Sequence, residues 1–256
     1  MKKLLSIIFC VFICFACNAE NGSGLTDTKG NTIATRFAPP AGFTRTAESQ
    51  NSFAAYLRNL PLKKDGALVK YFNGKTKPNL STYVAVVDME ISPKDLQQCA
   101  DAVMRLYGEY QFAENKINDI KFNFVSDGKP RYFKDYAKGD TSYKNFRKYM
   151  DYVFAYANTA SLLNQLRPVK DINDMKIGDV FIQKGRPFGH AVIVVDMAQN
   201  KEGKKVYMLA QSYMPAQETQ VLFNPMNVKL SPWYDLNGKT IVTPEWVFQP
   251  ADLRRF

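Results

Sequence analysis

The feature that most restricts the fold of this chain is a series of four strand-like stretches in its C-terminal half. They lie at 179–183, 191–195, 204–211 and 218–223, and turn-forming segments separate them. Strands joined by short loops usually pair with their sequence neighbours in antiparallel fashion. The chain contains neither GxGxxG nor GxxxxGK[ST], and its strands do not alternate with helices as in a parallel nucleotide-binding sheet. The sequence therefore predicts an antiparallel sheet.

The N-terminal half adds segments with helical periodicity. Apolar residues at helical spacing predict a short helix over 52–60, a helix that opens at Ser92 and runs to about Tyr110, and a long helix over 145–166. Strands are also expected at 83–89 and 120–125, and a loop at 128–141. Helices packed on one antiparallel sheet give an α+β fold, and 256 residues suit a single domain.

The first residues predict export. A basic Met1-Lys2-Lys3 precedes 13 uncharged, mostly apolar residues, Leu4 to Ala16. Because a transmembrane helix needs about 20 such residues, this pattern is typical of a signal peptide over 1–17. Cleavage at Cys17 would leave a lipid anchor on that residue, whereas cleavage after Ala19 would release a soluble form. A polar tether at 18–35 and one α+β domain at 36–256 are expected to follow, in the periplasm or on the outer membrane.

Removal of the signal peptide leaves one thiol, Cys99, and one imidazole, His190. An exported chain with one thiol forms no internal disulfide. A single histidine argues against zinc sites built from two or three histidines, so neither a metal nor another cofactor is expected. The excess of 34 basic over 24 acidic residues comes from scattered lysines, Lys75 and Lys77 among them, which we interpret as solubilising. No basic stripe with interleaved aromatic residues suggests nucleic-acid binding.

Residues 145–223 carry a motif in which GDVFIQ is followed by a short loop, GHAVIVVD, a turn and a strand that ends at Gln211. This order resembles the NlpC/p60-type and CHAP-type branch of the papain-like cysteine peptidases and amidases. The resemblance implies a papain-like core with an N-terminal elaboration, in which His190 is the general base and Gln211 orients its ring. In that pattern the catalytic cysteine opens the helix before the Thr-Ser segment, but the corresponding residues 141–146 contain no cysteine.

Cys99 therefore has two interpretations. On a helix that starts at Ser92 it lies about two turns in, on the apolar face, as a buried core residue would. Alternatively it is a nucleophile paired with His190, and a helix that starts later, near Gln97, would place the thiol at the positive helix end. Gln97 and Gln98 precede it, as an oxyanion-stabilising glutamine precedes the cysteine in papain-like enzymes.

The segment after Gln211 is rich in uncharged hydrogen-bonding groups. Ser212, Tyr213 and Gln217, together with Gln98, are predicted to bind substrate, because such groups suit an amide or peptide backbone. The alternative is a structural crossover between strands. Ser212 lacks the G-x-S-x-G context of a serine nucleophile.

Further positions are expected to shape the fold. Asp179 is interpreted as a turn-capping residue, and Asp196 as closing a strand at a turn. The aromatic and partly polar pairs Trp233-Tyr234 and Glu245-Trp246 either line a cleft or complete the core.

Nearly the whole mature chain, in stretches such as RFAPPAGF, VFAYANTASL and AQSYMPAQ, resembles exported Bacteroidetes proteins described as domain of unknown function 4846. That description implies no activity. From the NlpC/p60 resemblance we expect a cysteine hydrolase outside the cytoplasm that cleaves peptide or amide bonds, with cell-wall peptides as the natural substrate class. The alternative is a non-catalytic envelope lipoprotein or binding module on the same fold. The membrane would be contacted only through the lipid anchor.

Overall fold

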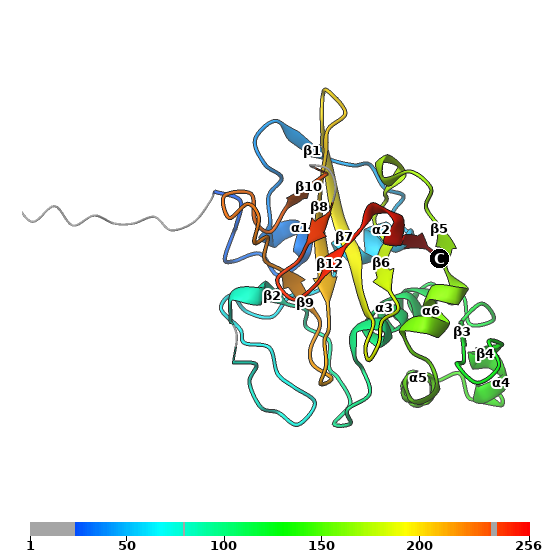
Figure 1. Ribbon diagram of the computed structural model, residues 1–256. Helices are drawn as coiled ribbons and strands as arrows, with labels where there is room; N and C mark the ends of the chain where they lie inside the picture. Colours follow the sequence, from blue (N-terminus) through cyan, green and yellow to red (C-terminus); the bar gives the residue numbers. More distant parts are fainter. Residues whose placement is uncertain (1–23, 79, 237–239) are drawn as a thin grey trace, which may run out of the picture.

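The computed structural model describes residues 24–78, 80–236 and 240–256, so the expected signal peptide and Cys17 lie outside the described residues. Within them, nine strands form one antiparallel sheet (Figure 1). The strands are β1 (Phe43–Arg45), β2 (Tyr83–Val86), β5 (Arg167–Pro168), β6 (Val180–Gln183), β7 (His190–Asn200), β8 (Lys205–Gln211), β9 (Gln220–Leu222), β10 (Tyr234–Asp235) and β13 (Leu253–Arg255). Seven follow the order β2-β9-β8-β7-β6-β13-β5, while β1 pairs with β7 and β10 with β8.

Helices and two small hairpins complete the described residues. The helices are α1 (Ile33–Arg36), α2 (Phe53–Arg58), α3 (Cys99–Ala113), α4 (Phe133–Ala137), α5 (Tyr143–Tyr156) and α6 (Thr159–Gln165), with 3-10 turns at Leu80–Thr82, Ile172–Asp174 and Pro250–Asp252. The hairpins pair β3 (Lys121–Asn123) with β4 (Pro130–Tyr132) and β11 (Ile241–Val242) with β12 (Val247–Phe248). The prediction of an α+β fold, with helices packed on a large antiparallel sheet, is confirmed.

The β7–β8 hairpin lies at the centre of the sheet, and its two strands pair in antiparallel fashion, as the short loops predict. Its strands pair from Ile193 opposite Ala210 to Gln199 opposite Lys205, with a register shift between Val194 and Asp196. The prediction that Asp196 closes its strand is wrong, because β7 continues to Asn200. The additional length pairs with β1 and projects beyond the neighbouring strands in Figure 1.

The predicted start of the helix at Ser92 is also wrong, since α3 begins at Cys99 with Gln98 as its N-cap. The backbone N–H of Gln98 donates to Asp101 Oδ2 (3.1 Å), which defines the helix start. The side chains expected to cap an earlier helix make tertiary contacts instead. Ser92 donates to a carboxylate on α5, and Asp95 accepts a backbone N–H from the segment after β8.

The single helix predicted over 145–166 is two helices, because Asn158 interrupts it. Its Oδ1 accepts the N–H groups of Ala160 (2.8 Å) and Ser161 (3.1 Å), while Ser161 Oγ accepts the N–H of Asn158 (2.9 Å). This reciprocal capping starts α6 anew. Likewise, the segment 128–141 is not simply a loop, since it contains β4 and α4.

The part of the expected tether that the structure describes, residues 24–35, is folded against the domain. Ile33 is fully buried, and the N–H of Ala38 donates to Leu25 O (2.8 Å). The buried Arg36 guanidinium donates to Gly30 O (2.7 Å). The polar composition of this stretch thus reflects turns that pack on the domain. Among the described residues, no helix has the length and apolar character needed to cross a bilayer.

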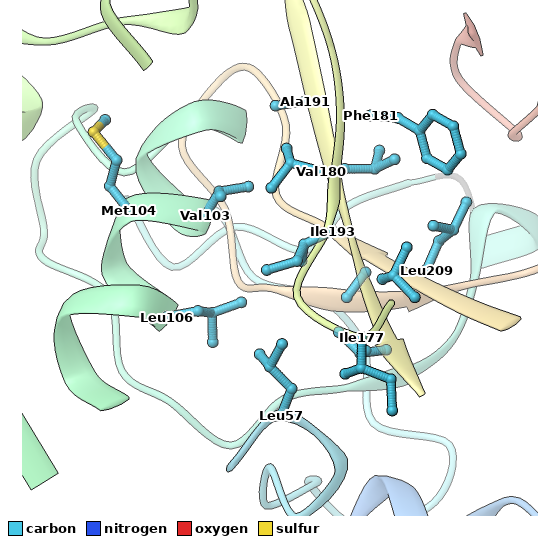
Figure 2. Packing of buried hydrophobic residues seen from close by; sticks show 14 of the residues in the cluster. Leu57, Val103, Met104, Leu106, Ile177, Val180, Phe181, Ala191, Ile193 and Leu209 are labelled. Atoms are coloured by element: carbon cyan, nitrogen blue, oxygen red, sulfur yellow. The ribbon is translucent and has the colours of Figure 1, made fainter. Parts of the chain in front are cut away.

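The main core lies between the sheet and the helices α2 and α3. Figure 2 shows Val103 and Leu106 of α3 facing Val180 and Ile193 of the sheet, with Leu57 of α2 alongside. All five side chains are at most 1% exposed. Burial of each stabilises the fold by about 1.5–3 kcal/mol. This packing fixes α3 against β7 and so places the N-terminus of the helix beside the start of that strand.

Candidate functional site

Cys99 occupies the first position of α3, where unsatisfied backbone N–H groups point out of the helix. Its thiol donates to the carbonyl of Gly189 (3.9 Å), the residue before His190. Position 189 has no room for a side chain, because a Cβ there would lie 2.4 Å from Gln183 O and 2.9 Å from Thr159 Cγ2. The fold therefore brings together two segments that are 90 residues apart in the sequence.

The thiol is enclosed, with 4% of Cys99 exposed. Burial, reinforced by the nearby Asp101 carboxyl, raises the pKa of Cys99 to about 11. Hydrogen bonds with the backbone of Ala191 and Ala100 and with the Thr159 side chain oppose this rise. In the resting protein at neutral pH, Cys99 is consequently a protonated thiol.

His190 is the first residue of β7 and is fully buried. Its Nε2 lies 2.8 Å from Gln211 Oε1 on the neighbouring strand β8, where the strand argument predicts this side chain. Aromatic rings enclose the imidazole, with centroids at 4.9 Å for Tyr213, 5.3 Å for Trp246 and 5.9 Å for Phe248. Nδ1 is buried and has no hydrogen-bond partner. One ring nitrogen thus has a hydrogen-bond partner, and the other has none.

The imidazole is neutral. Burial lowers the pKa of His190 to about 4, and the positive charge of Lys77 acts in the same direction, whereas the hydrogen bond that Gln211 Oε1 accepts opposes this shift. A neutral histidine can accept a proton, whereas an imidazolium cannot.

A chain of polar side chains continues beyond Gln211. Gln211 Nε2 donates to Glu245 Oε2 (2.6 Å), and Lys77 Nζ donates to both Glu245 oxygens (2.9 and 2.8 Å). The interpretation of Lys77 as a solubilising surface residue is wrong, since only 4% of it is exposed. No local sequence pattern marks Lys77 or Glu245 for this role, because Glu245 lies 34 residues from Gln211 and 168 from Lys77.

A cavity of about 330 Å³ opens at the N-terminal end of α3. Its lining includes Gln98, Cys99, Asp101, Thr159, Lys184 and Phe188. Gln98 is the one predicted substrate-binding residue in this lining, and its amide Nε2 donates to Asp95 Oδ1 (3.1 Å). Sequence reasoning did not single out Lys184 or Phe188, which is 60% exposed on the loop before β7.

The other predicted binding residues lie elsewhere. Ser212 is fully buried, and its hydroxyl lies 2.6 Å from Gln217 O and 3.2 Å from Gln97 O. Gln217 is 1% exposed and donates to Pro215 O (3.1 Å). Neither lines the cavity, so their contacts fit the structural-crossover interpretation. Tyr213 is partly buried against the imidazole.

Within residues 24–78, 80–236 and 240–256, no group of three or more His, Cys, Asp or Glu side chains is placed to hold a metal ion.

A family model described as "Domain of unknown function (4846)" matches residues 33–255, which span every element from α1 to β13. The chain belongs to this family. Neither the curated proteins nor the solved structures contain a match. The comparisons give no support to the NlpC/p60 resemblance, and the papain-like core remains a prediction. What the site does must accordingly be inferred from its own geometry.

Proposed function

We propose that this protein is a cysteine hydrolase that cleaves peptide or amide bonds, with Cys99 as nucleophile and His190 as general base. The observation that carries the proposal is that the domain's one thiol lies against the residue directly before its one imidazole. The thiol contacts the carbonyl of Gly189, directly before a histidine whose Nδ1 has no partner. A nucleophile, a base and an orienting side chain are the parts that such catalysis needs.

The order of elements supports the same proposal. Cys99 opens a helix, His190 opens a strand packed against that helix, and Gln211 ends the next strand. Residues 141–146, around the start of α5, hold no cysteine, but the helix whose N-terminus lies beside β7 is α3, and it begins at Cys99. Residues with these roles occur in this order in papain-like enzymes, which is the resemblance that we extend here.

In the proposed reaction, Cys99 Sγ attacks the carbonyl carbon of the substrate while His190 Nδ1 takes the thiol proton. The first-turn N–H groups of α3 stabilise the resulting oxyanion. His190 then returns the proton to the nitrogen of the breaking C–N bond, so that an amine leaves and a thioester remains. A water molecule, deprotonated by His190, attacks the thioester and releases the carboxylic acid and the thiol. Because both groups are neutral at rest, attack and proton transfer are coupled.

For the substrate we propose a cell-wall peptide or a similar amide-bearing ligand, bound in the cavity at Gln98. The protein would act after export, either as a lipoprotein anchored at Cys17 or as a soluble periplasmic protein. Catalysis needs no metal or organic cofactor in this scheme, since the thiol and the imidazole supply the chemistry.

The test incubates the purified mature protein with cell-wall peptide fragments and follows release of new amino groups. Cys99→Ala and His190→Ala should each abolish release, whereas Ser92→Ala, which alters a polar contact at α5, should not. Full hydrolysis by Cys99→Ala would refute the proposal. Thiol alkylation gives a second readout, since it should slow when His190 is replaced.

A second candidate is a non-catalytic binding module, which the low exposure and raised pKa of Cys99 favour. In that case the cell-wall fragments would bind without cleavage. Lys184→Ala and Phe188→Ala would weaken their binding, because both residues line the cavity.

A further inference from the structure

The amide of Gln211 has a fixed orientation. One end of an amide side chain accepts hydrogen bonds and the other end donates them. The partner of one end is the Glu245 carboxylate, 2.6 Å away, which only accepts. The NH₂ group must therefore face Glu245, and the carbonyl oxygen Oε1 must face His190.

This orientation determines which imidazole nitrogen carries hydrogen. Because Gln211 Oε1 only accepts, the 2.8 Å contact is a hydrogen bond only when His190 Nε2 is protonated. A neutral imidazole has one N–H group, so Nδ1 then presents a lone pair. Nδ1 is also the nitrogen that no other group in the described residues contacts by a hydrogen bond.

Lys77 keeps Glu245 in its accepting form. Its ammonium group reaches both carboxylate oxygens, and it is buried with a side-chain exposure of 4% against 18% for Glu245. Because both oxygens already accept from this ammonium group, the carboxylate meets the Gln211 amide as an acceptor. The neighbouring Trp246 donates Nε1 to Gln183 Oε1 (3.0 Å), which holds this segment at the sheet.

We propose that Glu245, held by Lys77, is a positioning residue that acts through Gln211 to fix His190 in the Nε2–H tautomer, with Nδ1 free to accept a proton. The tautomer is a property of the resting protein and goes beyond the proposed function. Only its use in catalysis rests on that function.

Because His190 is the only histidine in the chain, a ¹⁵N-histidine-labelled sample of the mature protein gives the NMR signals of one imidazole. The two nitrogens of a neutral ring differ strongly in ¹⁵N shift, according to which one carries hydrogen. At pH 7 the wild type should show a protonated Nε2 and an unprotonated Nδ1. A protonated Nδ1 in the wild type would overturn the proposal.

The variant Glu245→Gln removes the constraint on the Gln211 amide, because a glutamine at 245 can also donate a hydrogen bond. The Gln211 amide can then flip, so that its NH₂ group faces His190. We expect the Nδ1–H form to become populated or dominant in this variant. Glu218→Gln is the matched control, since Glu218 is another glutamate that pairs with a lysine, Lys63 (2.5 Å). It should leave the tautomer unchanged. If Glu245→Gln keeps the pure Nε2–H form, the proposal that Glu245 fixes the tautomer through Gln211 is refuted.

Gln211→Leu offers a second route if Glu245→Gln does not fold. It removes the amide that links Glu245 to His190, so the Nδ1–H form should again become populated. Retention of the pure Nε2–H form in this variant would count against the proposed role of Glu245 and Gln211. An inactive protein with the Nε2–H form would refute the proposed hydrolase function, whereas the proposal that Glu245 fixes the tautomer would stand. In an active protein, Glu245→Gln should lower kcat about 10–100-fold, with KM less affected.

Discussion

The two polar residues buried in β7, His190 and Asp196, differ in how completely their polar atoms are hydrogen-bonded. Both His190 and Asp196 are fully buried. Each Asp196 oxygen has partners, since Oδ2 accepts from Arg45 Nε (2.7 Å) and Oδ1 accepts from Arg58 Nε (2.6 Å) and from the N–H of Met197 (2.8 Å). His190 is held at one nitrogen only. A completely satisfied group stabilises the fold, whereas a buried ring nitrogen without a partner, in the residue directly after a glycine that lines a cavity, is a candidate for chemistry.

Charge separates the two positions further. Asp196 is paired with two arginines that are 22% and 13% exposed, so the ion cluster reaches solvent on one side. His190 is neutral and ringed by aromatic side chains. Changes at Asp196 should consequently alter stability, while changes at the Cys99–His190 site should mainly alter chemistry and pH dependence.

The largest expected loss of stability follows Asp196→Ala. It leaves two arginines without their carboxylate, and breaking such a buried pair costs about 3–5 kcal/mol in the free energy of unfolding. Urea unfolding followed by circular dichroism measures this. Asp127→Ala, which removes an exposed ion pair with Arg131, is the control and should leave the unfolding midpoint near that of the wild type. Equal effects of the two changes would mean that the Asp196 cluster stabilises the fold no more than an exposed ion pair does.

The next effect is a pH dependence from His190. Its pKa is about 4 in the folded protein, against 6.5 as the ordinary value, so between these values the unfolded chain binds a proton that the folded protein does not. Stability is therefore present above pH 6.5 and lost as the pH falls towards 4, by up to about 3 kcal/mol.

Comparison with His190→Asn isolates this contribution. The difference in unfolding free energy between wild type and variant should shrink as the pH falls from 7 to 4. A difference that stays constant over this range would show that the imidazole does not remain neutral in the folded protein.

Ser212→Ala should cost about 1–2 kcal/mol, because Gln97 O and Gln217 O lose the hydroxyl between them inside the protein. Thermal unfolding measures the change. If Ser212 bound substrate instead, as its sequence context predicts, the variant would lose ligand affinity at unchanged stability.

Cys99→Ala should have the smallest effect on stability, about 1 kcal/mol or less, since it removes one buried atom from a pocket that borders the cavity. The same unfolding experiment checks this, with Val103→Ala as a control in the core of α3. A cost of Cys99→Ala as large as that of Val103→Ala would favour the core-residue interpretation of the thiol.

The sequence predicted the elements that depend on local pattern. The β-branched stretches identified the strands around His190, and strand adjacency placed Gln211 beside the imidazole. The start of α3 was missed because Ser92 and Asp95, which are good capping residues, are used in contacts with distant segments. The alternative start near Gln97 was closer, and it changes the interpretation of Cys99.

The remainder of the site depends on long-range contacts that no local pattern reports. Glu245 and Lys77 meet across 168 residues, and Thr159 approaches Cys99 only because Asn158 ends one helix and starts another. Such residues can be identified only when the structure shows which side chains they contact.

The folded N-terminal segment has a consequence for where the protein can work. Residues from Leu25 onward are fixed to the domain, since Ala38 binds Leu25 O and accepts a hydrogen bond from Trp233 Nε1 (2.8 Å). If Cys17 carries the proposed lipid, only seven residue steps separate it from Gly24, and a fully extended chain of that length spans at most about 25 Å. A lipidated form of the proposed hydrolase could then act only on bonds within that distance of the membrane surface, whereas a soluble form could diffuse through the whole compartment.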